Sequence, residues 1–250
     1  MIFQLITQQA KHFIEHLLPA QCLVCALASN NKLICSYCEK KILSPRQFCL
    51  HCALPLNQTA DYCGDCLQKD YLFDQIHAIG DYKKPLSTLI KQLKYQQQLI
   101  AGELLAELLI KSVLCRYTKQ QLSTFDYLLA VPLHPKKLRL RGFNQAQIIA
   151  NSLHKALSIP VLENYITRSK NTMAQEGLSI SKRRKNLAGA FATTPNATQK
   201  IAGKNIIIID DVVTTGATMN SICKCLKKKG ANDLTVFCIS RTALNKEIEK

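Results

Sequence analysis

One stretch of thirteen residues constrains the fold of this chain more than any other. It reads Ile206-Ile-Ile-Ile-Asp-Asp-Val-Val-Thr-Thr-Gly-Ala-Thr218. Four consecutive β-branched apolar residues predict a strand that is buried on both faces, as in a parallel sheet. From Ala217 to Lys229 apolar residues recur at spacings of three and four, which predicts a helix. The predicted order is therefore strand, acidic pair, short loop and helix, and it indicates an α/β fold.

The loop between this strand and helix has the composition of a phosphate site. Backbone N–H groups at the start of a helix can cradle a phosphate. Thr214, Thr215 and Thr218 add hydroxyl groups, and Gly216 lets the backbone approach a ligand closely. The two preceding carboxylates would repel a phosphate but suit sugar hydroxyls or hydrated Mg²⁺. The pattern predicts a sugar-phosphate site; the alternative is a buried strand whose carboxylates only cap the helix.

The same residues closely resemble the motif with which type I phosphoribosyltransferases bind 5-phosphoribosyl-1-pyrophosphate (PRPP). The resemblance implies that the ribose hydroxyls are bound by Asp210 and Asp211, and the 5′-phosphate by Thr214, Thr215, Gly216, Ala217 and Thr218. It also implies an open, mostly parallel sheet with helices on both faces, and Mg²⁺ that accompanies PRPP.

Cysteine spacing predicts a second kind of site. Of the twelve cysteines, eight form four Cys-x-x-Cys pairs, namely Cys22 and Cys25, Cys35 and Cys38, Cys49 and Cys52, and Cys63 and Cys66. Two such pairs complete a tetrahedral shell of thiolates, so the eight predict two structural zinc ions. Redox dithiols and iron–sulfur ligation are the alternatives. Pairing of neighbours would give two successive ribbons, and a crossed arrangement is also open.

The change in cysteine density predicts the domain organisation. We expect an N-terminal amphipathic helix over residues 1–20, a zinc-ribbon module over 21–70 and an α/β domain over 71–250. A module of this size buries little apolar surface, so metal binding would supply its folding energy. The sequence shows no secretory signal and no apolar run long enough to cross a bilayer. A reducing cytoplasm is therefore the expected location.

A basic segment follows an earlier predicted strand, over residues 127–131. After Pro132-Leu-His-Pro135 come four cations, Lys136, Lys137, Arg139 and Arg141, and then a predicted helix from about Asn144 to Leu157. Loops at the carboxyl ends of neighbouring parallel strands face one crevice. We therefore expect this basic loop to meet pyrophosphate or DNA beside the phosphate loop, against the alternative of a solvated turn. Arg184 joins this set from a polar segment, 168–191, that we predict to be a mobile flap.

Net charge is +16 and is concentrated on the α/β domain. Residues 1–70 carry 6 Lys/Arg and 5 Asp/Glu (6 − 5 = +1), whereas residues 71–250 carry 27 and 12 (27 − 12 = +15). Such a surplus attracts polyanions, whether PRPP or a nucleic-acid strand. Solubility alone is the alternative explanation.

Taken together, the motifs resemble the ComF family of competence-associated proteins over nearly the whole chain. The resemblance is carried by the cysteine pairs and by the segments 131–135, 141–145, 175–179 and 210–218. It implies a PRPP-binding, phosphoribosyltransferase-like protein that handles incoming single-stranded DNA in the cytoplasm, with DNA-uptake or recombination proteins as partners. The alternatives are a catalytically active phosphoribosyltransferase of nucleotide salvage and an adaptor gated by PRPP.

Overall fold

The computed structural model describes residues 21–56, 60–169 and 189–242. The chain divides into two compact units, residues 1–44 and residues 45–250. The predicted N-terminal helix and most of the predicted flap, including Arg184, lie outside the described residues. Among the residues described, no helix is both long and apolar enough to span a bilayer.

The first unit is a small cysteine-rich ribbon. An antiparallel bridge joins Gln21 to Ala28, and the short helix α2 covers Ser36–Ile42. The buried side chains of its described part are few, and two of them are cysteines, Cys22 and Cys38. With so little apolar surface to bury, such a ribbon requires another source of folding energy.

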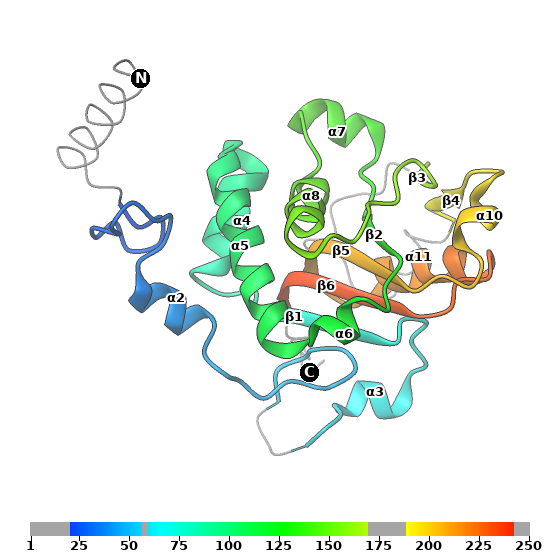
Figure 1. Cartoon of the computed structure of the whole chain (residues 1–250), viewed down its shortest axis with the longest axis horizontal. Helices are drawn as coiled ribbons and strands as arrows, with labels where there is room; N and C mark the ends of the chain where they lie inside the picture. The colour runs from blue at the N-terminus through cyan, green and yellow to red at the C-terminus, as the bar shows by residue number, and fades with distance from the viewer. Residues whose placement is uncertain (1–20, 57–59, 170–188, 243–250) are drawn as a thin grey trace, which may run out of the picture. The chain divides into compact units, whose positions relative to one another are not determined.

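The second unit is built on a parallel sheet of four strands in the order β1-β6-β5-β2 (Figure 1). The strands are β1 (Gln75–Asp81), β2 (Tyr127–Ala130), β5 (Ile206–Val213) and β6 (Leu234–Arg241). The four isoleucines that open β5 have no exposed surface, because this strand lies between β2 and β6. A separate antiparallel pair joins β3 (Ile166–Arg168) to β4 (Phe191–Thr193).

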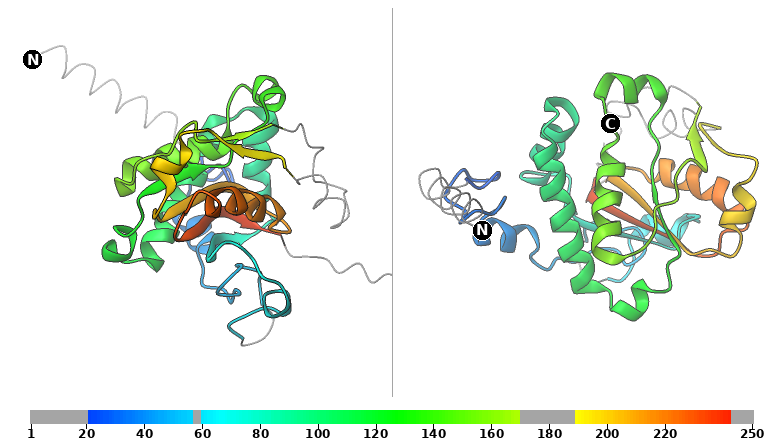
Figure 2. Two further views of the ribbon diagram at one scale, coloured as in Figure 1. Left: turned by 90° about the vertical axis from the view of Figure 1, so that its right-hand side faces the viewer. Right: turned by 45° about the horizontal axis from the view of Figure 1, so that its top comes forward.

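Helices cover both faces of this sheet, which confirms the predicted fold class (Figure 2). On one face, α4 (Leu86–Gln96) and α8 (Gln145–Leu157) flank α5 (Leu99–Arg116), the most apolar of the three. The helix α11 (Ala217–Lys227) forms the β5–β6 crossover and packs on the opposite face, as right-handed crossovers require. The remaining short helices are α3 (Gly64–Gln68), α6 (Lys119–Leu122), α7 (Pro135–Arg141) and α10 (Ala197–Ile201).

Two predictions were wrong, one about where a strand ends and one about the structure of the basic segment. Strand β5 continues through both acidic residues to Val213, because Asp210 and Val213 stay paired with Cys238 and Arg241 of β6. The basic loop is instead the helix α7, which begins with a proline at its first turn and a side-chain cap from His134. The cap places the imidazole Nδ1 3.2 Å from the Lys136 amide, which donates the hydrogen bond.

A buried histidine makes the stability of this unit dependent on pH. His77 on β1 is 3% exposed, its Nε2 lies 2.9 Å from Ser112 Oγ, and its ring meets Tyr117 and Phe237 edge-on. Burial, and then the charge of Arg116, lower the pKa of His77 to about 4. The folded protein therefore holds this imidazole neutral at pH values where an unfolded chain binds a proton.

We predict that His77 destabilises the folded state on acidification. An unfolded histidine titrates near pH 6.5, so the stability present above that pH is lost as pH falls to about 4, by about 3 kcal/mol. Denaturant unfolding of wild type and His77→Phe between pH 7 and pH 4 would measure this difference. Both proteins contain the same cysteines, so any acid-dependent loss of metal cancels. Identical pH slopes would contradict the assignment.

Candidate functional site

The acidic pair lies at the carboxyl end of β5, where two helices from earlier in the chain supply its partners. Asp210 is 9% exposed and Asp211 is 2% exposed. Lys94 of α4 forms an ion pair with Asp211 Oδ2, and Gln145 Nε2 of α8 donates to Asp211 Oδ1 at 3.2 Å. Gln145 Oε1 in turn accepts a hydrogen bond of 2.5 Å from Arg141 of α7. A continuous polar chain thus links α7, α8, β5 and α4.

These contacts give the two carboxyl groups opposite properties. Burial alone would raise the pKa of Asp211. The charge of the Lys94 ammonium and the hydrogen bonds that Asp211 makes outweigh burial and hold this pKa below its usual value. Burial, and then the charge of Asp211, raise the pKa of Asp210 well above its usual value. Asp211 is therefore the ionised member of the pair, and Asp210 is the member that binds a proton readily.

The loop after β5 turns sharply into α11. Gly216 caps the helix with φ 77°, a left-handed conformation in which a side chain would be strained. Thr215 Oγ1 accepts a hydrogen bond of 3.4 Å from the Ala217 amide. The loop Thr214–Gly216 therefore delivers the chain to the N-terminus of an eleven-residue helix, next to the acidic pair. The backbone N–H groups and the positive end of the dipole at a helix N-terminus make this end favourable for an anion.

Four cationic side chains gather around the acidic pair. Lys137 is half-buried, and burial followed by the charges of Arg168, Arg141 and Lys94 lowers its pKa. Arg168, at the end of β3, lies close enough to Asp210 to interact with it and has its guanidinium 5.3 Å above the Phe191 ring. Four cationic side chains face two carboxyl groups, so the site holds more positive than negative charge.

The helical form of the basic segment separates its four predicted cations into two pairs. Lys137 and Arg141 lie one turn apart on the same face of α7, and both are part-buried at the site. Lys136 and Arg139 are exposed. The structure therefore places two of these four residues with the acidic pair and leaves two in solvent.

Three residues of the site were missed from sequence. Lys94, Gln145 and Arg168 contact or face the acidic pair, yet none was predicted to be a site residue, although Gln145 ends the 141–145 segment and Arg168 begins the predicted flap. A signal existed for Lys94, which follows Leu93 and lies four residues after Ile90, on the edge of the apolar face of α4. A lysine there must reach a partner or solvent.

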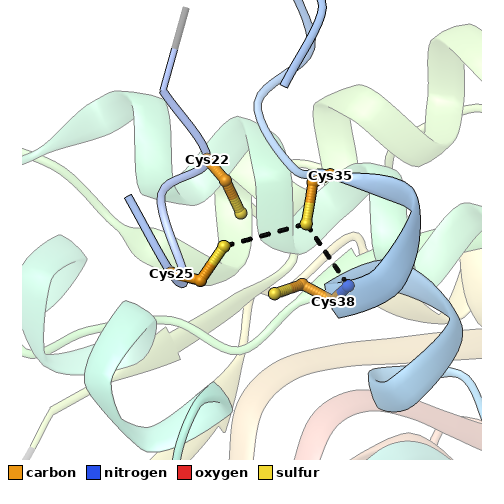
Figure 3. A group of neighbouring side chains, drawn as sticks. All are labelled: Cys22, Cys25, Cys35 and Cys38. Atoms are coloured by element: carbon orange, nitrogen blue, oxygen red, sulfur yellow. Dashed lines mark hydrogen bonds between the residues drawn. The ribbon is translucent and has the colours of Figure 1, made fainter. Parts of the chain in front are cut away.

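The first group of cysteines forms a compact cluster (Figure 3). The sulfur atoms of Cys22, Cys25, Cys35 and Cys38 all lie within 4.8 Å of one another, and Cys25 Sγ and Cys35 Sγ are 3.8 Å apart. Four sulfurs at about 2.3 Å from a tetrahedral zinc ion would be about 3.8 Å apart. The amides of Val24 and Cys38 donate to Cys22 Sγ and Cys35 Sγ, which favours thiolates.

The second group repeats this arrangement. Cys49, Cys52, Cys63 and Cys66 also have their sulfur atoms within 4.8 Å of one another, and Cys52 Sγ lies 3.5 Å from Cys63 Sγ. The Cys63 amide donates to Cys49 Sγ at 3.3 Å. Neighbouring Cys-x-x-Cys pairs therefore come together, and the crossed arrangement left open by the sequence is not adopted.

Comparison with known protein families accounts for both parts of the chain. A family described as a double zinc ribbon domain matches residues 13–67, and one described as a phosphoribosyl transferase domain matches residues 140–247. These matches agree with the two cysteine clusters and with the helix-covered parallel sheet.

Curated relatives resemble the chain over most of its length. Competence protein F of Haemophilus influenzae is 36% identical over 208 residues, which cover 83% of this chain and 90% of that protein. DNA utilization protein YhgH of Escherichia coli O157:H7 is 34% identical, over 90% of this chain and 98% of that protein. Competence protein ComFC of Bacillus subtilis is 25% identical, over 86% and 87% respectively. With its double zinc ribbon and phosphoribosyltransferase domain, the chain belongs to the family of Competence protein F and DNA utilization protein YhgH.

Proposed function

We propose that the site at the carboxyl end of β5 binds PRPP, and that the protein uses this site while handling single-stranded DNA in the cytoplasm. The observation that carries the proposal is the surplus of cations around the buried acidic pair: Lys94, Lys137, Arg141 and Arg168 against two carboxyl groups. The names of the relatives, which refer to competence and DNA utilization, support the connection to DNA. DNA-uptake or recombination proteins are the partners we expect.

The closely spaced, part-buried cations of the site are the reason to expect a ligand with several negative charges. Like charges that are part-buried together are unfavourable unless an anion joins them. A pyrophosphate group supplies several negative oxygens within one ligand and would pair with Lys137 and Arg141 of α7 through charge-assisted hydrogen bonds. The 5′-phosphate would occupy the loop Thr214–Gly216 and the start of α11, at Ala217 and Thr218.

The acidic pair suits the sugar between these two anionic groups. Both oxygens of Asp211 already have partners in Lys94 and Gln145, so Asp210 is the carboxyl with more to gain from the ribose hydroxyls. Hydroxyl donors stabilise its ionised form and lower its raised pKa. Mg²⁺ would arrive as part of the ligand, coordinated by pyrophosphate oxygens and water, as is usual for this ion.

We predict that PRPP affinity depends on Lys137 and Arg141, the two part-buried cations of α7. Isothermal titration with Mg²⁺-PRPP should show at least a roughly tenfold weaker Kd for the double variant Lys137→Ala, Arg141→Ala, since each lost charge-assisted hydrogen bond costs about 1.5–3 kcal/mol. The matched control, Lys136→Ala with Arg139→Ala, removes the same charge from the exposed face and should change Kd by less than about threefold. Equal losses in both variants, or no binding to wild type, would refute the assignment.

Nucleotide salvage is the second candidate function, and the match to a phosphoribosyltransferase domain favours it. Binding of PRPP alone does not make an enzyme, because a fold hosts several functions. Incubation with Mg²⁺-PRPP and a panel of nucleobases separates the two candidates. Pyrophosphate release that is lost in Asp210→Asn would establish catalysis; PRPP binding without release from any base would support a role as a PRPP-binding DNA-handling protein.

Binding of single-stranded DNA should be dominated by electrostatics. The +15 surplus lies on residues 71–250, and the sequence contains no tryptophan for base stacking. We predict that affinity for a labelled oligonucleotide falls on the order of 20- to 100-fold between 50 and 200 mM salt, as for roughly three to five phosphate contacts. Fluorescence anisotropy measures this. The Lys136→Ala, Arg139→Ala variant should reduce the salt slope, and an affinity that is independent of salt would contradict the proposal.

We also propose that each cysteine cluster binds one structural zinc ion. Sulfur spacing fits a tetrahedral thiolate shell, and a full shell leaves no position for a substrate. Elemental analysis of the purified protein should find about two zinc ions per chain, and about one in either Cys25→Ser, Cys35→Ser or Cys52→Ser, Cys63→Ser. Chelation should lower the Tm of wild type, because binding free energy of the metal is folding free energy. Iron in place of zinc, or no metal, would contradict this.

A further inference from the structure

A single buried side chain connects the second cysteine cluster to the phosphate loop. Arg241, at the end of β6, has no exposed surface. Its Nε donates a hydrogen bond of 2.9 Å to the carbonyl of Cys52, a member of the second cluster. Its Nη1 donates a hydrogen bond of 3.1 Å to the carbonyl of Val213, the last residue of β5. Thr214, the first residue of the phosphate loop, follows Val213 directly.

The burial of this guanidinium is favourable only where its surroundings are held in place. Removing a charged group from water costs several kcal/mol unless hydrogen bonds and an opposite charge compensate. Arg241 lies close enough to the Cys52 sulfur for their charges to interact. Four thiolates around one divalent ion carry net negative charge, so a metal-loaded cluster provides the compensation that Arg241 requires.

Aromatic packing makes a second connection between the same two places. His51 lies inside the Cys49–Cys52 pair, and its ring packs against Tyr71 and Phe73 with centroid separations of 5.8 and 5.2 Å. Its Nε2 also lies 3.0 Å from the Phe73 carbonyl oxygen, within hydrogen-bonding distance. The rings of Tyr71 and Phe73 stack on each other with centroids 4.8 Å apart.

These rings form the surface on which the phosphate loop rests. A Cβ added at Gly216 would be 3.4 Å from the Tyr71 ring and 3.5 Å from the Phe73 ring, so the glycine backbone packs directly against both. Between them in sequence, the Leu72 amide donates to Asn220 Oδ1 of α11 at 2.9 Å. The loop is therefore held from the strand side by Arg241 and from the helix side by the aromatic pair.

We propose that the second cysteine cluster and Arg241 are positioning elements of the phosphate loop, so that metal bound at Cys49, Cys52, Cys63 and Cys66 sets the affinity of that loop for PRPP. The proposal rests on the proposed function of the loop as the 5′-phosphate site. Loss of the metal releases the two Cys-x-x-Cys pairs from each other, and the Cys52 carbonyl and the His51 ring lose their fixed positions. The first cluster belongs to the other compact unit and supplies a matched control.

Hydrogen exchange and PRPP titration on the full-length protein test this coupling. The second-cluster variant Cys52→Ser, Cys63→Ser is compared with the first-cluster variant Cys25→Ser, Cys35→Ser. We expect the second-cluster variant alone to show faster amide exchange in residues 213–220 without ligand, and at least a roughly tenfold weaker Kd for Mg²⁺-PRPP. Equal behaviour of the two variants, whether both altered or both unaltered, would overturn the proposal.

A conservative variant keeps the test decisive if loss of the second cluster unfolds the domain. Arg241→Lys retains the charge but cannot reach both carbonyls with one planar group. We expect it to retain about two zinc ions per chain, to keep slow exchange in β1, and yet to show faster exchange in residues 213–220 and weaker PRPP binding. Arg46→Lys, at an exposed arginine of the same unit, should behave as wild type.

The two proposals fail in different ways. If wild type binds no PRPP, the proposed function is wrong, but the exchange comparison needs no ligand and still decides whether the cluster positions the loop. If wild type binds PRPP and Arg241→Lys exchanges in residues 213–220 as slowly as wild type does, the coupling is wrong and the proposed function stands.

Discussion

The buried ion pair between Lys94 and Asp211 is the interaction on which the candidate site depends. A strand of isoleucines carries two carboxyl groups into a region with almost no exposed surface, and an uncompensated charge there would cost several kcal/mol. Lys94 supplies the opposite charge from α4, and Gln145 supplies a hydrogen bond from α8. The ion pair leaves Asp211 ionised and Asp210 easily protonated, so two adjacent residues of one type acquire different chemistry.

The site is assembled from segments that lie far apart in sequence because the sheet is parallel. The carboxyl ends of β2 and β5 are neighbours, so the helix that follows β2 and the loop that follows β5 lie at the same edge of the sheet. Arg168 arrives from the separate β3–β4 pair. The cations and the acidic pair are thereby brought together without any one segment containing them all, and their balance favours a ligand with more than one anionic group.

The two cysteine clusters are alike in chemistry but differ in their place in the fold. The second belongs to the same compact unit as the sheet, and Arg241 and the His51–Tyr71–Phe73 packing connect it to β5 and α11. The second ribbon does more than complete a small domain, because its Cys52 carbonyl, through Arg241, and its aromatic neighbours contact the loop that follows β5. The relatives named for competence and DNA utilization align with this chain over 90% and 98% of their own lengths.

The sequence by itself determined the elements whose signals are local. Periodicity located the strand at Ile206 and the helix that follows Gly216, and spacing located the eight cysteines of two clusters. The α/β class and the double zinc ribbon followed from these patterns. Only the tertiary structure decided that Lys94, Gln145 and Arg168 meet the acidic pair, that α7 turns Lys137 inward and Lys136 outward, and that Arg241 joins a cysteine cluster to a loop. Such contacts join residues many positions apart, and a lone Lys, Gln or Arg carries no local pattern that shows which partner the packed chain will bring to it.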